Sequence, residues 1–200
     1  HFDEIHRLDP DAALALAEEH AWLMASEIRA SGVDLSFAPV VDLARGNRAI
    51  GQRAFHADPE VASALSLAYL RGMRLAGMAA TIKHFPGHGY VIPDSHVELP
   101  VDDRAFEAMQ DDIEPYRQLP LDGVMAAHVI YNCIDCNTAV FSNQWIGYLR
   151  DDIKFNGVVF TDDLSMAGAG VVGGMINRVE TAYNAGCYML LVCNAPDVVG

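Results

Sequence analysis

The chain has 200 residues, with 13 Lys and Arg against 27 Asp and Glu and a formal net charge of −14. This charge repels phosphate groups, so we expect neither nucleic acid nor a membrane surface as a partner. Apolar residues make up 52% of the chain, which predicts one globular domain with a sizeable core and excludes a disordered chain.

The four cysteines do not resemble a disulfide framework. Cys187 and Cys193 belong to an apolar, strand-like run, and Cys133 and Cys136 form one isolated pair. Such spacing is typical of a reducing compartment, so we expect a cytoplasmic protein. The pair provides half of a zinc site, but no second pair accompanies it, and we therefore expect no metal and no cofactor.

One sequence pattern recurs along the chain. A helix-like stretch ends near a glycine, and a short apolar strand follows directly. The strands are expected at residues 33–38, 78–82, 124–127, 158–160 and 187–192. Glycine suits the left-handed turn that ends a helix. Continuous apolar strands are typical of a parallel sheet buried on both faces.

The helices between these strands have clear start signals. Asp9-Pro10 and Asp58-Pro59 each place a capping side chain before a proline at the first helical position, and Ser142 caps a third helix. The apolar spacing predicts that these helices bury Leu14, Ala17, Ala21, Met24 and Ile28, then Val61, Leu65, Ala68, Gly72 and Leu75, then Ile146, Leu149 and Ile153.

Repeated strand–helix units leave two architectures, an open doubly wound sheet or a closed barrel. The glycine-rich phosphate turn of the open class is missing, and polar residues follow the strands where barrel enzymes carry their chemistry. We therefore predict an α/β fold of the (β/α)8 TIM barrel type, with about five units present. Residues 1–200 form one catalytic domain, with further units expected upstream of residue 1 and after residue 200.

The segment 83–89, KHFPGHG, follows one predicted strand and is the first candidate site. It provides the ammonium of Lys83, the imidazoles of His84 and His88, and glycines that let backbone amides approach a ligand. Either histidine alone is more often a buried residue bonded to a backbone carbonyl. Together with Lys83 at a strand end, they favour a group that binds sugar hydroxyls.

A long loop over residues 90–103 carries Asp94 and His96. Long loops in compact domains are often functional. An aspartate two positions from a histidine can orient the imidazole and stabilise its charged form, which gives a general acid/base that titrates near neutral pH. The alternative is an ordinary loop bond from Asp94 to its own backbone.

Adjacent carboxylates, Asp162 and Asp163, follow the strand at residues 158–160. Neighbouring side chains in a strand point apart, so the two cannot form a close catalytic pair without a bend. We predict that Asp162 faces the barrel mouth as a nucleophile and that Asp163 is structural. Two solvated acids at a helix start are the alternative.

Several of these segments resemble the bacterial β-N-acetylglucosaminidases of glycoside hydrolase family 3, which trim muropeptides during cell-wall recycling. The resemblance runs through residues 32–42 (GVDLSFAPVVD), 51–55 (GQRAF), 83–89, 94–96 (DSH) and 160–164 (FTDDL). The last three motifs together are highly specific, whereas the first mostly reports the fold.

The resemblance implies a two-step retaining mechanism on a single-domain barrel. Asp162 would attack the anomeric carbon, and His96, backed by Asp94, would serve as acid and then as base. Sugar hydroxyls would be bound by Arg53, Lys83, His84, His88 and, with a less certain role, His128. The substrate would be a GlcNAc-containing muropeptide, a small-molecule carbohydrate, and the protein a cytoplasmic monomer.

Four other interpretations remain open. One is a β-glucosidase of the same family. Another is substrate-assisted hydrolysis supported by Asp162 and Asp163. A third is a metal-dependent barrel hydrolase, in which histidines bind zinc, namely His84, His88, His96 and His128. The fourth is a non-catalytic sugar-binding remnant of a barrel.

Overall fold

The computed structural model describes residues 1–92, 99–195 and 197. Its main feature is a parallel sheet in which the order of the strands is their order in the chain. The strands are β1 (Leu35–Ser36), β2 (Ala79–Phe85), β4 (Gly123–Ala126) and β6 (Val158–Thr161). These are the first four predicted strands, which confirms the parallel sheet.

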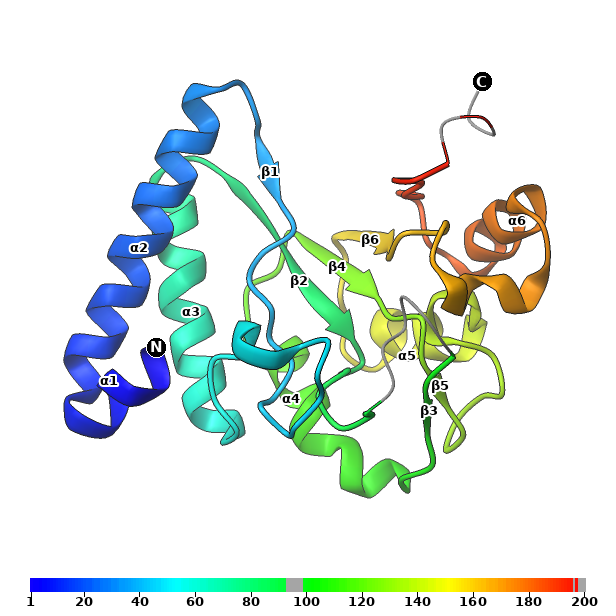
Figure 1. Ribbon diagram of the computed structural model, residues 1–200, viewed down its shortest axis with the longest axis horizontal. Coiled ribbons are helices and arrows are strands. Elements are labelled where there is room, and N and C mark those ends of the chain that lie inside the picture. The colour runs from blue at the N-terminus through cyan, green and yellow to red at the C-terminus, as the bar shows by residue number, and fades with distance from the viewer. Residues whose placement is uncertain (93–98, 196, 198–200) are drawn as a thin grey trace.

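Each crossover between these strands contains a helix, and the helices are α3 (Pro59–Leu75), α4 (Gln110–Gln118) and α5 (Asn143–Asp151). A doubly wound sheet reverses its strand order at a switch point. In the described chain, each new strand is added at the same edge of the sheet, as in a barrel. Figure 1 shows the strands lying between the helices. The prediction of a (β/α) barrel with about five units is confirmed.

The fifth unit is less regular than predicted. It consists of α6 (Met175–Ala185) and the segment 187–192, which forms a parallel bridge between Met189 and Phe160 rather than a strand. Leu191 N–H donates to the Thr161 hydroxyl at 2.9 Å instead of to a backbone carbonyl. This side-chain bond interrupts the backbone ladder, so the segment follows β6 without becoming a full strand.

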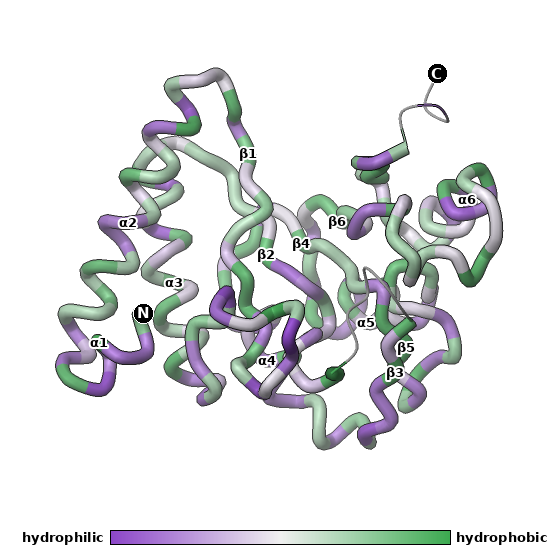
Figure 2. Tube along the Cα trace, in the orientation of Figure 1, coloured by the Kyte–Doolittle hydropathy of each residue, from purple (hydrophilic) through white to green (hydrophobic). Residues whose placement is uncertain are grey.

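Helices α1 (Phe2–Leu8), α2 (Pro10–Ala30) and α3 form a layer on one side of the sheet (Figure 1). The predicted caps are present, because Asp9 accepts from the N–H of Ala12 and Asp58 from the N–H of Glu60. Figure 2 shows hydrophobic and hydrophilic residues alternating along α2, as in an amphipathic helix. The helix α1 was not predicted.

The buried face of α2 agrees with the prediction at Ala17 and Ala21 but is centred on a row of alanines. Its fully buried residues are alanines spaced four apart, Ala13, Ala17, Ala21 and Ala25. The larger Leu14, Met24 and Ile28 are only partly buried at the edges of this ridge. Small side chains let α2 approach Gly72 of α3 so closely that a Cβ there would lie 2.1 Å from the Glu18 carbonyl oxygen.

In α3 the predicted core positions Leu65, Ala68 and Gly72 are buried and Val61 is partly buried, but one predicted position is exposed. Leu75, the last residue of α3, is 69% exposed, so its assignment to the core was wrong. In α5, Ser142 caps the helix by accepting from Trp145 N–H at 3.1 Å, and Ile146 and Leu149 are buried as predicted. Ile153 lies beyond the end of that helix and is partly buried.

Short elements complete the fold. Strands β3 (Val101–Asp102) and β5 (Ile130–Tyr131) pair in parallel, and four 3-10 turns are η1 (Gly51–Arg53), η2 (Phe106–Met109), η3 (Ala139–Phe141) and η4 (Ala167–Val172). Within the described residues, no helix combines the length and apolar character needed to cross a membrane.

Candidate active site

The carboxyl ends of β2 and β6 bring His84 and Asp162 together. His84 is the penultimate residue of β2, and Asp162 directly follows β6. The two strands flank β4, and the Nε2 atom of His84 lies 3.9 Å from Oδ2 of Asp162. The Asp162 side chain is 16% exposed, so its carboxylate is reachable from outside but largely enclosed by protein.

Lys83 precedes His84 and is half-buried at the same edge. Burial lowers the pKa of Lys83, while the nearby negative charge of Asp162 raises it and the positive charge of Arg53 lowers it. Lys83 is therefore within electrostatic range of both Asp162 and Arg53. A partly desolvated ammonium beside a carboxylate suits the binding of sugar hydroxyls next to a reacting centre.

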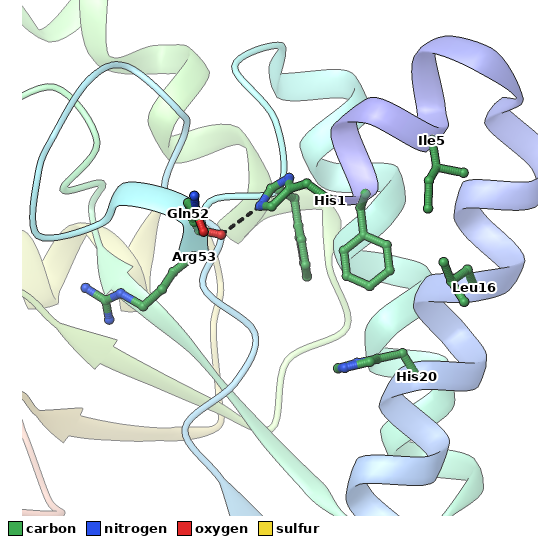
Figure 3. Close-up of a pocket in the computed structure, with 8 residues that line it drawn as sticks. His1, Ile5, Leu16, His20, Gln52 and Arg53 are labelled. Atoms are coloured by element: carbon green, nitrogen blue, oxygen red, sulfur yellow. Dashed lines mark hydrogen bonds between the residues drawn. The ribbon is translucent and has the colours of Figure 1, made fainter.

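Arg53 lies in η1 and is exposed, and its Nη2 donates to the carbonyl of Ala49 at 2.6 Å. A cavity of about 340 Å³ lies between η1, α1 and α2, lined by residues that include His1, Ile5, Leu16 and His20. Arg53 also lines this cavity, and Figure 3 shows its guanidinium pointing away from His1. The positive charge of Arg53 lowers the pKa of Lys83, so the guanidinium also acts on the site electrostatically.

Asp42 is a site residue that the sequence did not single out. Its side chain is fully buried, and it accepts hydrogen bonds from the backbone N–H of His88 at 2.6 Å and from Nδ1 of His84 at 2.7 Å. It follows an apolar run within residues 32–42, and this segment is typical of the fold more than of a functional site. No local signal marks Asp42, because its partners lie more than 40 residues away in the chain.

His88 is buried rather than open to solvent. Asn47 Nδ2 lies 2.9 Å from its Nδ1 atom and 2.8 Å from its carbonyl oxygen, and Asn47 also bonds the carbonyl of Val91. Burial lowers the pKa of His88, and the neighbouring His84 lowers it further. Asn47 was also missed, and its contacts hold the start of the long loop.

The adjacent carboxylates point to different partners, as predicted. Asp162 Oδ1 accepts only from the neighbouring N–H of Asp163 among the hydrogen bonds of the described residues. Asp163 accepts from four donors, which are Ser165 N–H, Ser165 Oγ, Cys193 N–H and Asn194 Nδ2. With its lone pairs occupied, Asp163 is structural, and Asp162 is the carboxylate open to a ligand.

His128 follows β4 and is fully buried. Its Nε2 lies 3.1 Å from the carbonyl oxygen of Asp163, so it contacts the backbone just after Asp162. Burial lowers the pKa of His128, opposed by the charge of Asp162. This position favours support of the Asp162 backbone over contact with a sugar.

Asp94 and His96 lie outside the described residues, although both flanks of their loop are described. Arg104 follows the loop, and its guanidinium carbon lies 4.0 Å from the ring centroid of Tyr90, the first residue of the loop. Among the described residues, no three His, Cys, Asp or Glu side chains are arranged to hold a metal ion.

The chain matches a known protein family and known proteins of that kind. The sequence model of the Glycosyl hydrolase family 3 N terminal domain matches residues 5–199. A beta-hexosaminidase of Stenotrophomonas maltophilia strain R551-3 is 52% identical over 200 residues, which cover 98% of this chain and 59% of that protein.

Two solved structures are similar throughout the chain. Native NagZ from Neisseria gonorrhoeae matches with a TM-score of 0.92 and 42% identity, over 99% of this chain and 59% of that one. NagZ from the same organism in complex with N-trifluoroacetyl-D-glucosamine matches with a TM-score of 0.90, the same identity and the same coverage. The chain thus spans about three fifths of the length of these relatives.

Proposed function

Because the chain belongs to glycosyl hydrolase family 3, we propose that the full-length protein is a retaining exo-glycosidase that removes terminal β-linked N-acetylglucosamine. The observation that carries the proposal is Asp162, a largely enclosed carboxylate at the carboxyl end of β6 with His84 3.9 Å away. Barrel enzymes carry their catalytic groups at this end of the strands.

In the proposed mechanism, Asp162 attacks the anomeric carbon and forms a covalent glycosyl ester. The bond to the leaving oxygen breaks as His96, oriented by Asp94, gives that oxygen a proton. His96 then takes a proton from water, which attacks the same carbon and releases Asp162. Two inversions at one carbon retain its configuration.

The sugar hydroxyls are bound by Lys83, His84 and Arg53. His84 lies 3.9 Å from Asp162, and Lys83 is within electrostatic range of both Asp162 and Arg53. The lowered pKa of Lys83 and its half-burial support this role, since a partly desolvated donor binds a hydroxyl more strongly than one in water. His88 and His128 were predicted to bind the sugar as well. Their burial favours a supporting role for both.

N-acetylglucosamine is favoured over glucose by the relatives. One is a beta-hexosaminidase, and a NagZ neighbour binds N-trifluoroacetyl-D-glucosamine. The finer proposal is a muropeptide from recycled peptidoglycan as substrate, acted on by a cytoplasmic monomer. The net charge of −14 disfavours nucleic acid as a ligand.

The test compares two chromogenic substrates, a β-N-acetylglucosaminide and the matching β-glucoside, with the full-length protein. Asp162→Asn keeps the size of the side chain and removes the nucleophile, so kcat should fall at least about 1,000-fold. Asp151→Asn, an exposed acid at the end of α5, is the control and should keep wild-type activity.

A fluorinated, slowly hydrolysed glycoside then separates the mechanisms. Mass spectrometry should find the sugar attached to the peptide that contains Asp162. Substrate-assisted hydrolysis leaves no such adduct, and an adduct on another residue would disprove the assignment of Asp162. If neither chromogenic substrate is hydrolysed, the sugar-binding remnant becomes the better interpretation.

A further inference from the structure

Asp42 lies beside the end of β2 because the chain after β1 continues along that strand. Val41 N–H donates to the carbonyl of Lys83 at 3.0 Å, and Val40 forms a parallel bridge with the same residue. The Asp42 side chain is fully buried. A buried carboxylate is costly unless donors surround it, so its partners indicate what it does.

Three groups donate to Asp42, and all come from the segment 83–89. They are the backbone N–H of His84 at 3.2 Å to each oxygen, the backbone N–H of His88 at 2.6 Å, and the Nδ1 atom of His84 at 2.7 Å. One anion thus fixes two points of the loop backbone and one side of the His84 ring.

Asp42 accepts these bonds as a carboxylate. Burial alone would raise the pKa of Asp42, but the charge and hydrogen bond of His84 and the N–H of His88 hold it below its ordinary value of 3.8. An ionised carboxylate has no proton to donate. The hydrogen between Asp42 and His84 therefore belongs to Nδ1.

The protonation of Nδ1 determines whether Nε2, on the opposite side of the ring, donates or accepts a hydrogen bond. Nε2 of His84 faces Oδ2 of Asp162 at 3.9 Å, which is too long for a hydrogen bond. In the neutral ring, Nε2 is an acceptor, so two acceptors face each other across this gap. A hydroxyl of the bound sugar beside this gap can donate its hydrogen to one of the two acceptors.

We propose that Asp42 is a positioning residue that holds His84 with Nδ1–H against its carboxylate and Nε2 directed toward Asp162 and the sugar. The proposal rests on the proposed glycosidase function. Asp42 acts on the sugar through the groups that it holds and not by direct contact, since its own side chain is fully buried. A carboxylate that fixes the tautomer and orientation of a histidine is a common device in enzymes.

The first experiment reads the tautomer of His84 directly, by 15N NMR of imidazole-labelled full-length protein, with His84→Gln to assign the signal. The wild-type ring should carry a proton on Nδ1. In Asp42→Asn, the amide oxygen accepts the backbone N–H groups and its NH2 group faces Nδ1, so the proton should move to Nε2. A wild-type ring with bare Nδ1 would overturn the proposal, whether or not the protein is an active glycosidase.

The second experiment measures kcat/KM for release of N-acetylglucosamine. Asp42→Asn should lower kcat/KM by about 10- to 100-fold, as loss of an orienting partner does. The matched control is Ser142→Ala. Ser142 is a fully buried polar residue outside the site, and its hydroxyl caps α5 by accepting from Trp145 N–H at 3.1 Å. The variant should lower the melting temperature while kcat/KM stays within about twofold of wild type.

The two readouts separate the possible failures. An active wild type with equal losses of activity in Asp42→Asn and Ser142→Ala, and an unchanged tautomer, would show that Asp42 only stabilises the fold. An inactive wild type would contradict the proposed function, while its tautomer would still decide the role of Asp42. If Asp42→Asn does not fold, the wild-type tautomer alone supports or overturns the proposal.

Discussion

Oδ1 of Asp163 accepts a hydrogen bond from the backbone N–H of Cys193 at 2.9 Å. The same carboxylate accepts from Asn194 Nδ2 at 3.0 Å, and from the N–H and hydroxyl of Ser165. Asp163 thereby ties the irregular fifth segment to the end of β6. Since Asp162 is its neighbour, these bonds also fix the backbone of the proposed nucleophile.

Replacement of Asp163 by alanine should destabilise the protein by about 2–4 kcal/mol, because it leaves several partly buried donors without an acceptor. Urea unfolding of the full-length protein measures the loss. Ser165→Ala removes the hydroxyl donor alone and should cost about 1 kcal/mol. Equal losses for the two variants would show that Asp163 does not organise this region.

Acid should unfold the protein partly through Asp163. Burial raises its pKa, but the Ser165 hydroxyl and three further donors hold the pKa below 3.8. A carboxylate with a depressed folded pKa contributes stability above its unfolded pKa, and this stability is lost as the pH falls through the folded value. Stability should therefore decline below about pH 4.

Asp163→Asn should flatten part of this acid decline, measured as the urea midpoint from pH 6 downward. The comparison must be between variant and wild type, because Asp112 works in the opposite direction. Burial raises the pKa of Asp112 despite the nearby Arg104, so its contribution falls as the pH rises. If the urea midpoint falls equally at low pH in Asp163→Asn and in wild type, the prediction is contradicted.

The sequence predicted the fold wherever the signal was local. Asp9-Pro10 and Asp58-Pro59 mark the starts of α2 and α3, and the structure confirms both caps. The buried face of α2 was predicted in part. Hydropathy selects Leu14 and Ile28 beside Ala17 and Ala21, whereas close packing on Gly72 buries only the alanines fully. That choice depends on a partner helix about 50 residues away.

The candidate site was also predicted only where the signal was local. Lys83, His84 and Asp162 were predicted from their positions after apolar strands, and the structure places all three at one edge of the sheet. Asp42 and Asn47 were missed, because each acts through bonds to the segment 88–91 or to His84, more than 40 residues away in the chain. Their roles for catalysis stay predictions.

Replacement of two helix glycines by alanine should have opposite effects on stability. In α3, a Cβ on Gly72 would lie 2.1 Å from the Glu18 carbonyl oxygen, whereas in α5 a Cβ on Gly147 meets nothing within 4 Å. Gly72→Ala should cost about 1–3 kcal/mol through overpacking of α2 on α3. Gly147→Ala should gain about 0.5–1 kcal/mol from helix propensity. Thermal unfolding of both variants tests the pair, and a stabilised Gly72→Ala would contradict the close approach.

Chelation should not change the activity of the full-length protein. The proposed mechanism uses Asp162 and His96 without a metal. Dialysis against EDTA, followed by the β-N-acetylglucosaminide assay, should leave kcat unaltered. Activity that is lost on chelation and restored by zinc would instead favour the metal-dependent hydrolase, with His96 among its ligands.

Arg104 joins two buried carboxylates next to the loop that carries His96. Its Nε and Nη2 bind Asp102 in a bidentate pair, with Nη2 at 2.7 Å from Oδ2, and its Nη1 lies 2.8 Å from Asp112 Oδ2. The side chains of Asp102 and Asp112 are fully buried, and that of Arg104 is 10% exposed. The Tyr90 ring stacks on the guanidinium, so one cation contacts residues on both sides of the loop.

Arg104→Met should therefore destabilise the protein by about 3–5 kcal/mol, because two buried carboxylates lose their main counter-charge. Arg71→Met is the control, since the Arg71 pair with Glu18 is largely exposed and should contribute less than about 1 kcal/mol. Urea unfolding compares the two variants. Arg104→Lys keeps the charge but not the bidentate geometry, so it should recover only part of the loss. Full recovery by lysine would show that charge alone, and not the planar fork between Asp102 and Asp112, holds the two flanks of the loop.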